Sequence, residues 1–166
     1  MSRARFLFGA AILMAAGAAL WPVPVVTVTA APPGSGGAAP VARTLLRVPL
    51  HAVVEIRLEY THSVERTRVV ETYLAERSGL RLVRMEFASQ GAGLPSEGYV
   101  REGNRFVLRT DRPLASLPVR VSGIGRQRLF VGGAVLELLA AAGEGGIVTV
   151  AVGTAPRLPL LRGMLY

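Results

Sequence analysis

Alternation of apolar and polar residues predicts short strands over most of the chain. In AVVEIRLEY, residues 52–60, Val54, Ile56, Leu58 and Tyr60 would share one face of a strand and charged residues the other. Turn-forming glycines and prolines separate this segment from further strand-like stretches at residues 80–89, 105–110, 117–122 and 147–153.

Two local patterns add a hairpin and a helix. In RLFVGGAVLEL, residues 128–138, Gly132 and Gly133 can adopt the positive φ angles of a two-residue turn between two apolar runs. The following LELLAAAGEGG, residues 136–146, permits one short helix before its glycines. The whole pattern predicts an all-β fold: an antiparallel β-sandwich or partly closed barrel of about eight to ten short strands with at most one short helix.

The N-terminus has the pattern of an export segment. Arg3 and Arg5 precede an apolar run from Phe6 to Trp21, and Val28-x-Ala30 fits a signal-peptidase site. With the following VPVVTV, the run is also long enough for a permanent membrane anchor. In either case the basic residues would keep the N-terminus in the cytoplasm and place the remainder outside, in the periplasm.

These features divide the chain into three parts. Residues 1–30 are predicted to be a signal peptide or inner-membrane anchor. Residues 31–42, which include APPGSGGAAP, read as a flexible linker, and residues 43–166 as one extracytoplasmic β domain.

Composition narrows the classes of function. The net charge is +8, and all 19 basic residues are arginine, but they are spread singly through strand-like segments. We therefore expect no concentrated basic patch and no nucleic-acid partner. The absence of cysteine excludes disulfides, thiolate nucleophiles and cysteine-based zinc sites.

The segment LEYTHSVERTRVVETY, residues 58–73, concentrates the candidate chemistry. If the strand continues beyond Tyr60, His62 falls on the apolar face, whereas Ser63 and Glu65 fall on the opposite one. Ser63 and His62 then point apart and cannot form a nucleophilic dyad. Because the chain also lacks GxSxG, and its one aspartate lies in a turn-like TDRP, a triad hydrolase is disfavoured.

His62 has two other interpretations that the sequence leaves open. A hydrogen bond to Glu71 would either pin a turn or line a pocket. Alternatively, His62 as base and Glu71 as orienter would serve a periplasmic hydrolase or metal-assisted enzyme. A metal is disfavoured because His51 is the only other histidine, and no cofactor is predicted.

A glycine-rich segment, SQGAGLPSEG at residues 89–98, could present backbone N–H groups to an anion. It lacks the ending and the following helix of a phosphate loop. A glycine turn or bulge that links two strands is therefore the favoured interpretation.

Taken together, YTHSVERT, VVETY and EFASQGAGLP resemble the family called domain of unknown function 1850 (DUF1850), over roughly residues 44–153. The chain departs from the family at Arg68, where proline is common. The resemblance carries over to Tyr60, Thr61, His62, Ser63, Val64, Glu65, Glu71, Gly91, Gly93, Leu94 and Pro95.

That family consists of short exported or membrane-anchored β domains, commonly encoded beside TRAP transporters of the TAXI class. The resemblance implies a non-enzymatic extracytoplasmic accessory domain that contacts the transporter's permease or solute-binding subunit, or holds a small-molecule ligand where the two motif blocks meet. A purely structural envelope protein is the remaining alternative.

Overall fold

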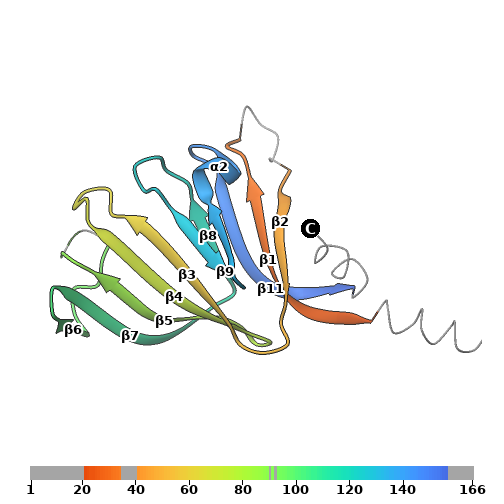
Figure 1. Ribbon diagram of the computed structural model, residues 1–166, viewed down its shortest axis with the longest axis horizontal. Helices are drawn as coiled ribbons and strands as arrows, with labels where there is room; N and C mark the ends of the chain where they lie inside the picture. The colour runs from red at the N-terminus through yellow and green to blue at the C-terminus, as the bar shows by residue number, and fades with distance from the viewer. Residues whose placement is uncertain (1–20, 35–40, 90, 92, 157–166) are drawn as a thin grey trace, which may run out of the picture.

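Two antiparallel sheets form the protein in its computed structural model, which describes residues 21–34, 41–89, 91 and 93–156 (Figure 1). The four-stranded sheet has the order β2-β1-β11-β8, and its strands are β2 (Arg43–Pro49), β1 (Pro22–Ala31), β11 (Ile147–Pro156) and β8 (Ser116–Arg120). The seven-stranded sheet has the order β10-β9-β3-β4-β5-β7-β6, and its strands are β10 (Ala134–Glu137), β9 (Arg128–Val131), β3 (Val54–Thr61), β4 (Arg68–Glu76), β5 (Gly79–Phe87), β7 (Arg105–Leu114) and β6 (Tyr99–Glu102).

The core lies between the two sheets and confirms the predicted all-β sandwich. On β3, Ile56 and Leu58 are buried against the core, whereas Arg57 turns to the opposite face. Val26 and Val150 contribute from the four-stranded sheet. In Figure 1, β4, β5, β7 and β6 fan away from the four-stranded sheet, so the sandwich opens toward one side.

The two local patterns are also confirmed. Gly132 and Gly133, with φ of 56° and 86°, connect β9 to β10 as the hairpin turn. The short helix α2 (Leu138–Ala142) follows directly, and its Leu138 is fully buried in the core.

Residues 22–30, which the sequence assigned to the signal peptide or anchor, belong to β1 inside the sandwich. This strand pairs with β11 on one side and β2 on the other, and Val25, Val26 and Val28 are at most 1% exposed. The segment predicted as a linker, residues 31–42, begins at the last residue of β1 and precedes β2 in the chain. Residues 1–20, to which the export segment was assigned, and 35–40 lie outside the described residues.

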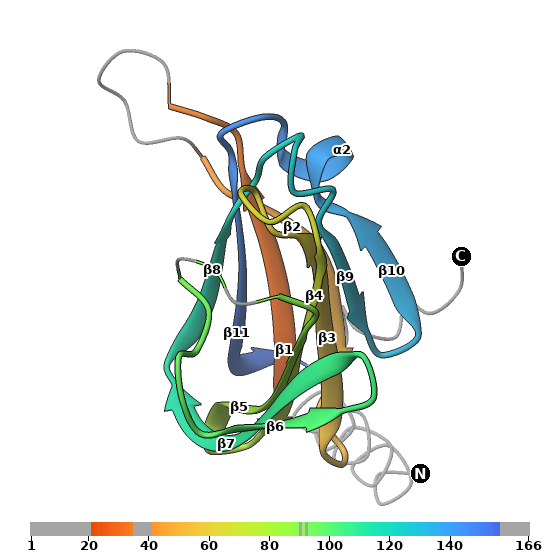
Figure 2. The same cartoon turned by 90° about the vertical axis from the view of Figure 1, so that its left-hand side faces the viewer.

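Both ends of the described chain lie at one end of the sandwich, where Pro22 pairs with Pro156. The opposite end carries α2 and the turn between β3 and β4, as Figures 1 and 2 show. Within the described residues, no helix has the length and apolar character needed to cross a membrane.

Candidate functional site

The predicted histidine motif forms a closed turn at the end of β3. The N–H of His62 donates to the carbonyl of Thr67 at 2.8 Å, and the N–H of Arg66 donates to the carbonyl of His62 at 2.9 Å. Arg66 adopts a left-handed φ of 55°, which lets the chain reverse. The strand ends at Thr61, so strand alternation does not govern Ser63 and Glu65, and both lie exposed in the turn.

His62 itself is buried, as its pattern predicted, at 8% exposure. Its Nδ1 accepts a hydrogen bond from the backbone N–H of Glu65 at 3.2 Å. This contact makes Nδ1 an acceptor that fixes the turn, and therefore assigns His62 a structural role in shaping the loop.

The two motif blocks meet in space, as the resemblance implied. Gly91 packs so closely against the turn that a Cβ there would lie 2.7 Å from Glu65 Cγ and 3.2 Å from His62 Cε1. The N–H of Leu94 donates to the carbonyl of Gly91 at 3.0 Å. Gly93 has a left-handed φ of 87°. The next two residues, Leu94 and Pro95, are both half-buried. We call the turn at residues 62–67 together with Gly91 and residues 93–95 the motif corner.

Glu71 binds two tyrosines in the place of its predicted histidine partner. The hydroxyl of Tyr60 donates to Glu71 Oε1 at 3.0 Å, and the hydroxyl of Tyr73 donates to Oε2. Burial raises the pKa of both tyrosines, and the charge and hydrogen bonds of Glu71 raise it further. The triad Tyr60–Glu71–Tyr73 is thus a polar link in the inner face of the sheet, and Glu71 does not orient His62 as a catalytic base would require.

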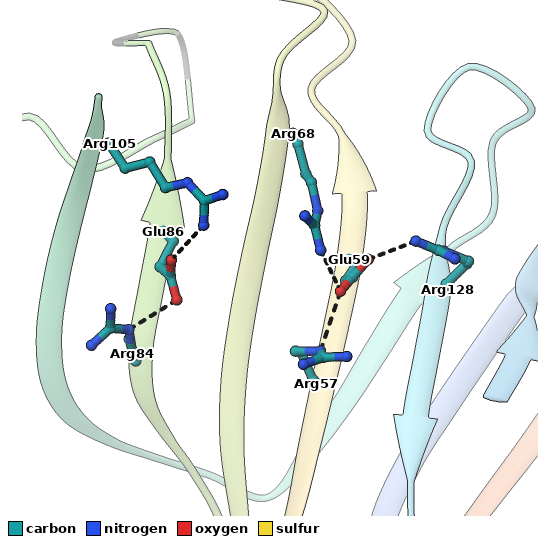
Figure 3. A network of polar contacts seen from close by, with 7 residues as sticks. All are labelled: Arg57, Glu59, Arg68, Arg84, Glu86, Arg105 and Arg128. Carbon is teal, nitrogen blue, oxygen red and sulfur yellow. Dashed lines mark hydrogen bonds and ion pairs between the residues drawn. The ribbon is translucent and has the colours of Figure 1, made fainter. Parts of the chain in front are cut away.

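A second polar group, on the outer face of the seven-stranded sheet, was missed by sequence reasoning. Figure 3 shows three arginines from three strands converging on Glu59. Arg68 Nη2 lies 2.6 Å from Oε1, and Arg128 Nη2 lies 2.8 Å from Oε2. Arg57 Nε lies 3.2 Å from Oε1 but is not aligned for a hydrogen bond. The expectation that the arginines stay dispersed is therefore wrong for these three, which we call, with Glu59, the Glu59 cluster.

Sheet register explains how separated arginines become neighbours. Thr61 pairs with Arg68 across β3 and β4, and Glu59 pairs with Arg128 across β3 and β9. Pairing of residues far apart in sequence thus creates the cluster. The alternating charges of Glu55, Arg57 and Glu59 were the only sequence signal for a polar face.

The three neighbouring arginines lower the pKa of the Glu59 carboxyl. Burial by itself would raise the pKa of its carboxyl, but the hydrogen bond from Arg68 and the charges of the three arginines lower the pKa below its usual value. The carboxylate therefore stays ionised and holds the guanidinium groups in place.

The same face carries a second set of ion pairs. Glu86 accepts from Arg84 Nε at 3.0 Å and from Arg105 Nη1 at 3.2 Å, and its pKa is also lowered, since the arginines outweigh burial. Figure 3 shows Arg68 on the strand between the two carboxylates.

A hollow of about 330 Å³ adjoins the Glu59 cluster. It is lined by Glu59, Tyr60, Thr61, Arg68, Arg126, Arg128 and Glu137. Two of these residues, Tyr60 and Thr61, were candidates from the sequence. Within the described part of the chain, no group of three or more acidic or histidine side chains is placed to hold a metal ion.

Comparison with known proteins identifies a family. A family model described as "Domain of unknown function (DUF1850)" matches residues 56–138, from the third residue of β3 to the first residue of α2. No curated protein and no solved structure matches the chain.

Proposed function

The chain belongs to the DUF1850 family, and from this premise we propose that it is an extracytoplasmic accessory domain of a TAXI-type TRAP transporter that contacts a transporter subunit. The apolar run after Arg3 and Arg5 supports export, either as a cleaved signal or as an inner-membrane anchor. The partner is the permease or the solute-binding subunit.

One observation carries the proposal: the motif corner is internally fixed yet presents side chains to solvent. His62, Glu65 and Gly91 pack against one another inside it. At its tip, Ser63 is exposed and the side chain of Val64 is 69% exposed. A rigid turn that displays an apolar residue suits recognition by another protein, because little conformational freedom is lost on binding.

The contacts of the titratable residues favour this function over catalysis. His62 Nδ1 is engaged by a backbone N–H, and Glu71 is engaged by two tyrosine hydroxyls. A base and orienter pair would need hydrogen bonding between the two side chains. The alternative of a hydrolase that uses His62 and Glu71 is therefore less well supported.

Co-purification tests the proposal directly. The tagged protein, purified from its own cells, should recover the permease or solute-binding subunit of a TAXI-type TRAP transporter, and Val64→Asp should reduce that recovery at least several-fold. The matched control is Val100→Asp, which places the same charge at a valine of 53% exposure on β6. Failure of the wild-type protein to recover either subunit, together with unchanged solute uptake after gene deletion, would contradict the proposal.

A structural envelope role makes a different prediction for the same experiments. It requires that His62→Ala lowers the amount of folded protein while uptake per folded molecule stays unchanged. The contact function requires that Val64→Asp reduces uptake with no change in the thermal unfolding midpoint.

A further inference from the structure

We infer that the Glu59 cluster binds an oxyanion, a carboxylate or phosphate group, in the adjoining hollow. This site goes beyond the proposed contact function, since it lies on the outer face of the sheet and is independent of transporter association.

Charge is the first argument. Arg68 and Arg128 line the hollow together with the one carboxylate that both bind, Glu59, and Arg57, which is not part of the lining, adds a third positive charge beside that carboxylate. Arg126 also lines the hollow, and it forms no ion pair with any residue that the structure describes. Glu137 at the edge of the hollow offsets part of this excess. The remaining positive charge favours a negatively charged ligand.

Hydrogen-bonding capacity is the second argument. Each guanidinium carries five N–H donors, and Arg68 and Arg128 each use one nitrogen, Nη2, on Glu59. The other donors of these two side chains stay available at the hollow, since the side chains are 57% and 46% exposed. The planar guanidinium fork matches the oxygens of carboxylate and phosphate groups in a bidentate manner.

Preorganisation is the third argument. The Glu59 side chain is 5% exposed and its oxygens fix the positions of Arg68 and Arg128. Phe130 supports the cluster from β9: the guanidinium carbon of Arg57 lies 4.3 Å from its ring centroid and that of Arg128 lies 5.6 Å away. An oxyanion would therefore meet arginines that are already ordered, so binding would cost less side-chain entropy.

Calorimetric titration of the purified full-length protein tests the site. Succinate and citrate form one arm, inorganic phosphate the second, and chloride at matched ionic strength the control. We expect saturable binding in at least one of the first two arms, and the arm that binds distinguishes the carboxylate from the phosphate source.

Variants then locate the binding. Arg68→Gln and Arg128→Gln should each weaken it about tenfold, the effect of losing one charge-assisted contact. Glu137→Gln should strengthen it, because it removes the opposing charge. Arg81→Gln is the charge-matched control, since Arg81 pairs with Asp111 elsewhere on the sheet. Circular dichroism confirms folding of each variant.

Two outcomes would overturn the inference. One is absence of saturable binding in both oxyanion arms by the folded wild-type protein. The other is that Arg81→Gln weakens oxyanion binding as much as Arg68→Gln does. That result would mean that the net charge of the protein attracts the anion and that no specific site exists. If Arg68→Gln fails to fold, the other two variants still test the site. Arg128→Gln should weaken oxyanion binding, whereas Glu137→Gln should strengthen it.

Discussion

Gly91 faces the side chain of Glu65 so closely that a Cβ at position 91 would displace that side chain. A Cβ at position 91 would come within 2.7 Å of Glu65 Cγ. The contact joins segments that are separated by β4 and β5 in sequence, so the shape of the motif corner depends on the small size of one residue.

Gly91→Ala should therefore destabilise the protein by about 1 kcal/mol, the low end of the usual cost of overpacking, because the Glu65 side chain that the new Cβ displaces is exposed and can shift. Urea unfolding measures the change. Glu65→Ala in the same chain should recover most of the loss, because it removes the colliding Cγ, and the double-mutant cycle would show strong coupling. Additive effects would mean that the collision is relieved elsewhere.

Acid should weaken the outer face of the sheet. The pKa values of Glu59 and Glu86 are lowered in the folded protein from the ordinary value of 4.5. Their contribution to stability is thus fully present above about pH 4.5 and is lost as the pH falls below it. Urea unfolding between pH 7 and pH 3 should show this decline.

Glu59→Gln should flatten that decline. At pH 7 it should cost about 1–3 kcal/mol, since hydrogen bonds to a charged group are lost. Glu97→Gln, at an exposed position, is the control and should keep the wild-type pH profile. A Glu59→Gln profile as steep as that of the wild type would contradict the assigned role of Glu59.

High pH should destabilise the inner face of the seven-stranded sheet, because Tyr60 and Tyr73 ionise there. Their pKa values are raised above the ordinary 10.0, so the stability they contribute is complete below about pH 10 and is lost as the pH rises further. Spectrophotometric titration should find that Tyr60 and Tyr73 ionise above the ordinary value of 10.0. Tyr60→Phe with Tyr73→Phe should remove that late phase, and its persistence would assign it to other tyrosines.

Truncation tests the place of β1 in the fold. A chain of residues 22–166 should unfold cooperatively, whereas residues 32–166 should not fold, because a fully buried valine contributes roughly 1.5–3 kcal/mol against a total stability of roughly 5–15 kcal/mol. Val25, Val26 and Val28 would all be lost. Circular dichroism with thermal unfolding compares the two chains.

The N-terminus of the protein isolated from its own cells gives an independent check on the same strand. N-terminal sequencing should find either an intact N-terminus or a new one upstream of Pro22. Cooperative folding of residues 32–166, or a mature protein that begins at Ala31, would show that β1 is dispensable.

Local patterns allowed much of this fold to be predicted from sequence. The alternation in β3 and the glycine pair of the β9–β10 hairpin each lie within one short segment, so the chain shows them directly. The meeting of His62 with Gly91 was expected from the family resemblance, and the burial of His62 from strand alternation.

The remaining features depend on pairing between distant segments. β1 reads as a continuation of the apolar N-terminal run until its partner β11, near the other end of the chain, is known. Likewise, Arg68 and Arg128 meet at Glu59 only through the registers of β3 with β4 and with β9. No periodicity within a single segment reports such a register.

The pairing of Pro22 with Pro156 brings both ends of the described chain together at one end of the sandwich. A tether joined to the chain just before β1 would hold the sandwich at that end. The motif corner would then lie at the opposite end of the sandwich, farthest from the tether. A partner would then contact Ser63 and Val64 at a distance from the tether that is set by the length of the strands. Added residues before Pro22 would change that distance and leave the structure of the motif corner unchanged.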